Sequence, residues 1–119
     1  MATVKVALNK GLTIGDEKHT EAEIREASAG DLIDATDESE KLTLTPDGYQ
    51  LIASPTAVGL NTLRRQIVRV GTYDGPLSMG ELKKLSAVDI SLLQEGAARL
   101  DSATMEEVSK RGRADQASA

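Results

Sequence analysis

The sequence predicts a small α+β domain in which an N-terminal β hairpin packs against three main helices and one short helix. A length of 119 residues is enough for one modest core. Apolar residues alternate with polar ones near the N-terminus, as in half-buried strands, and recur at spacings of three and four further along, as on helices. We expect residues 1–108 to form the domain and residues 109–119 to form a flexible polar tail.

The N-terminal segment has the pattern of a hairpin. Valine and leucine alternate with lysine and alanine from residue 4 to residue 8, and the alternation continues to Ile14. The sequence Gly-Asp-Glu-Lys at residues 15–18 is typical of a turn, and a weaker alternation follows over residues 19–27. This pattern predicts two antiparallel strands joined by a short turn.

A first helix is predicted over residues 29–40. Ser28 and Asp31 have the spacing of a capping box, with an acidic side chain in the first turn facing the helix dipole. The apolar content of this segment is thin, chiefly Leu32, Ile33 and Ala35, and its outer face is strongly acidic.

The segment from 42 to 53 has two interpretations. Leu42 and Leu44 precede a Pro-Asp-Gly turn sequence at residues 46–48, and Leu51 and Ile52 follow it. A second hairpin or a long ordered loop fits this pattern.

The central helix is predicted to run from Pro55 to Val70 and to stop at Gly71. Ser54 can cap it, and proline is well suited to the first helical position. Its apolar stripe recurs at spacings of three and four and consists of Leu60, Leu63, Ile67 and Val70.

Two further helix starts follow. Ser78 and Glu81 form a second capping box, which predicts a short helix to about Leu85. Ser86 and Asp89 repeat this spacing and open a last helix of some 15 residues or more, whose apolar stripe comprises Ile90, Leu93, Ala97 and Leu100.

The composition excludes several kinds of chemistry. The chain has no cysteine, which rules out disulfides, thiolate catalysis and cysteine-ligated metals. Its single histidine, His19, lies in a polar stretch and is interpreted as a surface residue, and no nucleotide-binding fingerprint occurs. The acidic residues have no signal of an apolar pocket around them. We therefore predict no enzyme activity, no cofactor and no metal site.

Charge and hydropathy bear on partners and location. The formal net charge is −5, and residues 1–53 hold 11 acidic against 5 basic side chains, which does not favour binding to nucleic acid or to anionic lipid. No signal-peptide pattern and no stretch of about 20 apolar residues occurs, so we expect a cytoplasmic protein without a membrane partner.

The most suggestive candidate site is a basic ridge on the predicted central helix. Arg65 and Arg69 would lie one turn apart, with Arg64 beside them and with Leu63 and Ile67 as aliphatic neighbours. The arginines can pair with the acidic first helix within the same fold. Alternatively, the ridge receives an acidic or amphipathic helix of a partner. DNA binding is a third interpretation, which the net charge does not favour.

Three runs of the sequence resemble a known family. They are ASAGDLIDATDESEKL at residues 27–42, SPTAVGLNTLRRQIVRVG at residues 54–71 and GPLSMGELKKLSAVDISLLQEGAARLD at residues 75–101. Together, in this order and spacing, they are similar to the tail assembly chaperones of Mu-like bacteriophages and prophages. None of these runs is a catalytic signature.

The resemblance implies a non-enzymatic role in building a phage tail. Chaperones of this family work with the tape measure protein, a long and largely helical chain that tail tube subunits later enclose. The resemblance further implies a longer product, made by a programmed frameshift, whose added segment recruits tail tube protein. We expect the chain in the host bacterial cytoplasm and not in the mature virion.

Other roles remain open at this point. One is a small structural tail-completion or adaptor subunit that stays in the virion, and another is a phage-encoded regulator of a host protein or nucleic acid. The sequence leaves a homo-oligomer open and does not say which face meets a partner.

Overall fold

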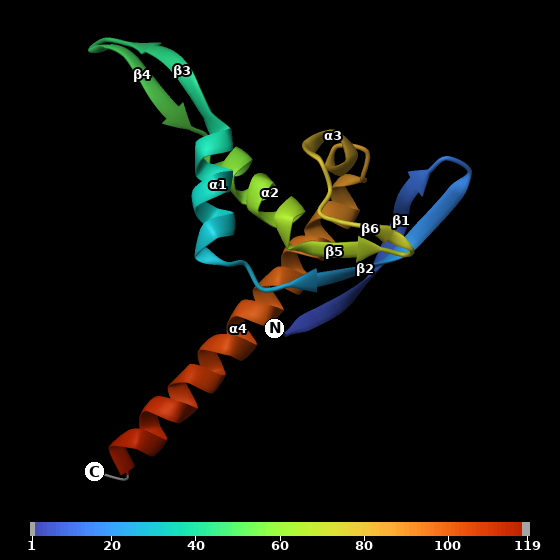
Figure 1. The fold of residues 1–119 in the computed structure, drawn as a ribbon, viewed down its shortest axis with the longest axis vertical. Coiled ribbons are helices and arrows are strands. Elements are labelled where there is room, and N and C mark those ends of the chain that lie inside the picture. The colour runs from blue at the N-terminus through green and yellow to red at the C-terminus, as the bar shows by residue number, and fades with distance from the viewer. Residues whose placement is uncertain (1, 118–119) are drawn as a thin grey trace.

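The computed structural model describes residues 2–117, and the side chains of residues 2–112. It confirms the α+β class and the N-terminal hairpin (Figure 1). The main sheet is antiparallel, with the spatial order β1-β2-β5-β6. Its strands are β1 (Thr3–Ile14), β2 (Glu17–Arg25), β5 (Ile67–Val70) and β6 (Tyr73–Asp74).

The remaining elements surround this sheet or extend from it. Within residues 2–117 the helices are α1 (Ala29–Ser39), α2 (Pro55–Gln66), α3 (Met79–Leu82) and α4 (Ala87–Ala117). The strands β3 (Glu40–Thr45) and β4 (Gly48–Ala53) pair only with each other within that part of the chain. We call this pair the β3–β4 ribbon, and we call the main sheet with its four helices the body.

The core lies between the main sheet and the first half of α4. The helix packs against β1 and β2, and Leu93 on it is completely buried. Gly96 sits at the closest approach, since a Cβ atom there would lie 2.6 Å from a methyl carbon of Val6. Alternating side chains of β1, including Val6 and Leu8, enter the same core, as the sequence pattern predicts.

The predicted central helix is too long by four residues. It ends at Gln66, and Ile67–Val70 is instead a strand that pairs with β2, with Ile24 opposite Ile67 and Ala22 opposite Val70. Three of these four residues are β-branched, which favours an extended backbone when a strand edge is available for pairing. Ile67 and Val70 are three residues apart, a spacing that would place them on opposite faces of a regular strand. Both are nevertheless core residues, because the pairing of β5 with β2 is irregular.

The predicted helix starts are confirmed, and the last helix runs further than expected. Ser28 with Asp31 and Ser78 with Glu81 each form both hydrogen bonds of a capping box. Helix α4 continues to Ala117, so residues 109–117 are helical and extend well beyond the sheet (Figure 1). The predicted boundary at 108 and the flexibility of the tail stay predictions, and residues 118–119 lie outside the described residues.

Asp89 has a role that its capping spacing did not indicate. Its backbone N–H donates to the hydroxyl of Ser86, as expected. Its completely buried carboxylate, however, accepts hydrogen bonds from the backbone N–H groups of Asn9 at 2.6 Å, Lys10 at 3.1 Å and Gly11 at 2.9 Å. Burial alone would raise the pKa of Asp89, but these three bonds together lower it below its ordinary value. The start of α4 is thereby joined to an irregular stretch of β1, where the pairing with β2 shifts register.

One other expectation, about His19, was wrong. His19 is buried rather than on the surface, because Gly71 packs against its ring and the positive φ of Gly71 brings the turn after β5 close to it.

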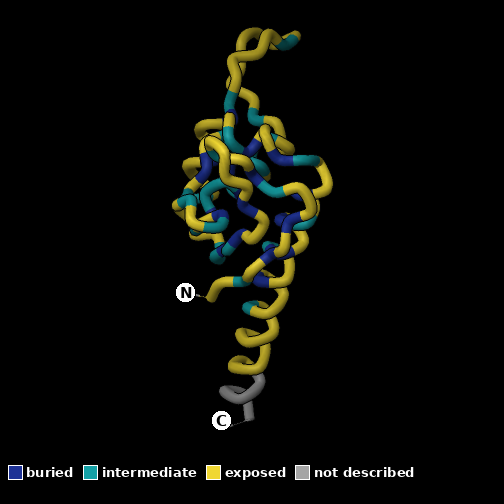
Figure 2. Tube along the Cα trace, turned by 90° about the vertical axis from the view of Figure 1, so that its right-hand side faces the viewer, coloured by how far each residue is buried: buried dark blue, intermediate teal, exposed yellow. Residues whose placement is uncertain are grey.

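The β3–β4 ribbon confirms the second hairpin among the two interpretations of residues 42–53. It leaves the body where α1 ends and returns where α2 begins, so it projects beyond the packed layers (Figures 1 and 2). In Figure 2 its trace is almost entirely exposed.

Candidate functional site

The five residues predicted to bind a partner lie in different environments. Leu63 and Ile67 are core residues with exposed fractions of 3% and 1%, so in this conformation they offer no surface to a partner. Arg64 and Arg65 are half-buried on α2, and Arg69 is exposed on β5. Because β5 is not helical, Arg65 and Arg69 do not stand one turn apart, and the arginines do not form one ridge.

Arg64 and Arg65 are engaged within the fold. Both guanidinium groups bind the carboxylate of Glu38 on α1, Arg64 at 2.5 Å. Arg64 also donates to the backbone oxygen of Leu77 at 3.1 Å. Hydrogen bonds from Arg65 and then from Arg64 hold the pKa of Glu38 below its ordinary value, against the effect of burial. The pairing of these arginines with the acidic first helix, one of the alternatives from sequence, is therefore present in the structure.

Arg69 makes a separate, cross-strand pair. Its guanidinium lies 3.1 Å from the carboxylate of Glu23, the residue opposite it on β2. Half of the Arg69 side chain is exposed. As a binding site, the set of five residues stays a prediction.

Arg25 joins α1 to the sheet and to α2. Its two terminal nitrogens lie 2.6 Å and 3.0 Å from the carboxylate oxygens of Asp31, and one of them also donates to the backbone oxygen of Arg65. The guanidinium of Arg25, assisted by hydrogen bonds from Ser28, lowers the pKa of Asp31 from 3.8 to about 2. This fixes the orientation of α1, and so of the ribbon that follows it.

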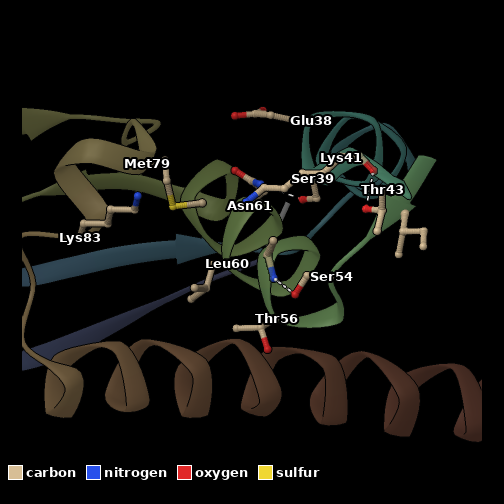
Figure 3. Close-up of a pocket in the computed structure, with 12 residues that line it drawn as sticks. Glu38, Ser39, Lys41, Thr43, Ser54, Thr56, Leu60, Asn61, Met79 and Lys83 are labelled. Carbon is tan, nitrogen blue, oxygen red and sulfur yellow. Dashed lines mark hydrogen bonds between the residues drawn. The ribbon is translucent and has the colours of Figure 1, made fainter. Parts of the chain in front are cut away.

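A groove lies between the base of the ribbon and the helices. Figure 3 shows Met79 of α3 and Lys83, which directly follows α3, on one side, Lys41 and Thr43 of β3 on the other, and Leu60 of α2 between them. The volume of the groove is about 560 Å³. A second hollow of about 470 Å³ shares Leu60, Met79 and Lys83 with it and continues toward the start of α4.

The groove has no arrangement typical of a catalytic or metal site. Its polar groups are hydroxyls, one amide, two lysines and Glu38, which is already paired with arginines. In the part of the chain that the structure describes, no three His, Asp or Glu side chains are grouped so that they could hold a metal ion. Among the same residues, no helix is both long and apolar enough to cross a membrane.

The largest exposed apolar surface is on the ribbon. Leu42 lies opposite Leu51, and Leu44 lies opposite Tyr49, so all four side chains share one face. Their exposed fractions are between 66% and 70%. The sequence left a hairpin or an ordered loop open here and did not predict an uncovered apolar face, because an alternating pattern does not show whether another element packs on it.

Helix α1 adds a smaller apolar surface. Leu32 and Ile33 are exposed, and the buried side of the helix is made of Ala35 and Ser39 instead. The acidic Asp34 and Asp37 are exposed on the same helix. The hydroxyl of Ser39 accepts a hydrogen bond at 2.8 Å from Asn61 of α2, which explains why this polar side is buried.

Comparison with known proteins places the chain in a family. The family described as "Tail assembly protein gp41", of Mu-type phages, matches residues 8–113. The chain belongs to this family. It is therefore a phage tail assembly protein, as the resemblance of its sequence indicated.

Similar proteins include one from a prophage and two from a phage. The chain is 41% identical over 115 residues to the "Mu-like prophage FluMu protein gp41" of Haemophilus influenzae, covering 96% of this chain and 91% of the relative. It is 44% identical over 90 residues, 72% of this chain, to two proteins of Escherichia phage Mu. They are the "Probable tail assembly protein gp41", of which the match covers 62%, and the "Probable tail assembly protein FS-gp41", of which it covers 48%.

No solved structure matches the chain. The family and the two phage Mu relatives are named for tail assembly.

Proposed function

We propose that the protein is a tail assembly chaperone, which transiently binds the tape measure protein and keeps it soluble while tail tube subunits assemble around it. The observation that carries the proposal is the amount of apolar surface that this protein, a member of a tail assembly family, leaves exposed. Ten large hydrophobic side chains are exposed among the described residues, on a chain with a net charge of −5.

This combination suits a protein that masks the apolar surface of another chain. Large exposed apolar patches are typical of protein-binding sites. The negative charge keeps a complex dissolved through repulsion between copies. Most of the exposed side chains lie on the ribbon and on α1, two separate elements, and this arrangement favours several weak contacts, which permit release when tube subunits compete for the partner.

Coexpression tests the proposal directly. The tape measure protein of the same phage or prophage is produced with and without this chain, and the soluble fraction of the tape measure protein is measured after centrifugation. We expect the chain to move most of the tape measure protein into the soluble fraction and to co-purify with it. A tape measure protein that is equally insoluble in both cases contradicts the proposal.

The contents of finished particles distinguish a chaperone from a structural subunit. A chaperone acts in the host cytoplasm and leaves before the virion is complete, whereas a tail-completion or adaptor subunit stays. Mass spectrometry of purified particles should therefore detect tube and tape measure proteins but not this chain. Its presence at a fixed ratio to tube protein would favour the structural alternative.

A longer form that recruits tail tube protein is part of the proposal. The two phage Mu relatives match this chain over the same 90 residues, but that match covers 62% of one and only 48% of the other. A family member thus occurs at two lengths in one phage, as a frameshift extension would produce.

A further inference from the structure

We propose that the apolar face of the β3–β4 ribbon is where the tape measure protein binds, and that the segment bound is an amphipathic helix with lysine or arginine beside its apolar stripe. This inference rests on the proposed function and assigns it a surface and a ligand chemistry. The face consists of Leu42, Leu44, Tyr49 and Leu51.

In the described residues the apolar face of the ribbon has no second layer packed on it. A two-stranded hairpin is at best marginally stable in water unless its apolar face packs on another layer. In the described residues no helix or strand covers this face, and the four side chains are at least 66% exposed. The covering layer is therefore expected to come from another chain.

The shape of the face suits a helix. Leu42 and Leu51 form one cross-strand pair, and Leu44 and Tyr49 form the next, about 7 Å along the strands. Apolar residues three and four apart on a helix recur every 5–6 Å along one side, which is a similar repeat. A helix of about 10 Å diameter also covers a two-stranded ribbon across its width.

A helix fits better than an added strand. The outer edges of β3 and β4 are unpaired in the described residues, and a strand could bind to either edge. Strand addition, however, leaves the four apolar side chains in water. A helix that lies across the face removes them from water, and this burial stabilises the complex more than strand addition would.

The charges around the face select a basic partner over a second copy of this chain. By strand alternation Glu40 lies on the same side as Leu42, whereas Lys41 lies on the opposite side and lines the groove of Figure 3. Asp34 and Asp37 are exposed on α1, the helix that leads directly into β3. Lysine and arginine beside an apolar stripe are attracted to these carboxylates, and a second acidic chain is repelled.

The decisive experiment compares two apolar surfaces of similar exposure. In the ribbon variant, Leu42→Thr, Leu44→Thr and Leu51→Thr remove three of the four apolar side chains of the face but keep residues that favour strands. In the control variant, Met105→Gln and Val108→Gln remove two exposed hydrophobics of α4, whose exposed fractions are 67% and 53%. Both variants should keep the melting temperature of the wild type, since all five side chains are exposed.

Each full-length variant is coexpressed with the tape measure protein. We expect the ribbon variant to reduce the soluble tape measure protein at least tenfold and the control to change it less than twofold. If the ribbon variant works as well as the wild type, this inference is wrong and the proposed function stands. If the wild type itself fails, both are wrong. If sedimentation shows a wild-type dimer that the ribbon variant converts to a monomer, a second copy covers the face and the inference is overturned.

A charge reversal tests the chemistry of the bound helix. Asp34→Lys with Asp37→Lys should weaken binding of the tape measure protein severalfold and flatten its dependence on salt concentration. Asp101→Lys with Glu106→Lys, on the exposed side of α4, is the matched control and should have a smaller effect. Equal or tighter binding after the reversal on α1 would show that the ligand is not basic beside its apolar stripe.

Discussion

The two hairpins of this protein have similar alternating sequence patterns, but only the first has its apolar face buried. In β1 and β2, alternating apolar residues face α4 and form the core, and Leu12 is 1% exposed. In the β3–β4 ribbon, Leu44 belongs to an equally regular alternation and is 68% exposed. The difference is the presence of a covering helix. An alternating pattern specifies that a strand has an apolar face, and the rest of the chain, or another chain, decides what covers it.

The largest expected effect is a loss of stability when a leucine of the first hairpin is shortened, which the same change in the ribbon should not cause. Leu12→Ala should lower the free energy of unfolding by about 2–5 kcal/mol, because it opens a cavity in the core. Leu44→Ala should lower it by less than about 0.5 kcal/mol, because the side chain is already in water. Urea denaturation of the two variants measures both values. A loss above about 1 kcal/mol for Leu44→Ala would mean that the ribbon is packed in solution.

A second prediction concerns the pH dependence of stability, to which the body and the ribbon's apolar face should contribute differently. The pKa of Asp31 is about 2 in the folded protein and 3.8 in its ordinary state, so the charged carboxylate is stabilised by folding. This contribution, about 2 kcal/mol, is complete above pH 4 and is lost as the pH falls toward 2. None of the four side chains of the ribbon's apolar face carries a carboxylate, so the face itself makes no such contribution.

The measurement uses Asp31→Asn as the reference. At pH 7 the wild type should be more stable than this variant by about 2 kcal/mol, and the difference should shrink steadily between pH 4 and pH 2. Denaturant midpoints at several pH values report it. A difference that stays constant over this range would show that the pair with Arg25 does not hold the pKa of Asp31 low.

Local signals predicted much of the fold. The capping boxes at Ser28 and Ser78 satisfy backbone groups within one turn, so neighbouring residues suffice to identify them. The turn at residues 46–48 is equally local. Family membership was also visible, because it depends on the order of short runs and not on tertiary contacts.

The misplaced features depend on partners far along the chain. Ile67 and Val70 have a spacing that fits a helix, and only the free edge of β2 makes them a strand. Asp89 has a capping spacing, but its carboxylate binds the backbone of residues 9–11, some 80 positions away. The candidate site shows the same limit. Arg64 and Arg65 were identified as notable residues, yet their partner Glu38 and the uncovered face of the ribbon emerge only from packing.

Deletion of most of the ribbon should also have only a small effect on stability. Glu40 and Ala53 are opposite each other at the base of the ribbon, so an Asn-Gly turn can join them in place of residues 41–52. None of the removed residues belongs to the core cluster, and shortening the connection lowers its entropic cost. The free energy of unfolding should therefore change by about 1 kcal/mol or less, as measured by urea denaturation, while solubilisation of the tape measure protein is lost. Collapse of the whole fold would instead mean that the ribbon supports α1 and α2, and the division into a stable body and a binding ribbon would have to be abandoned.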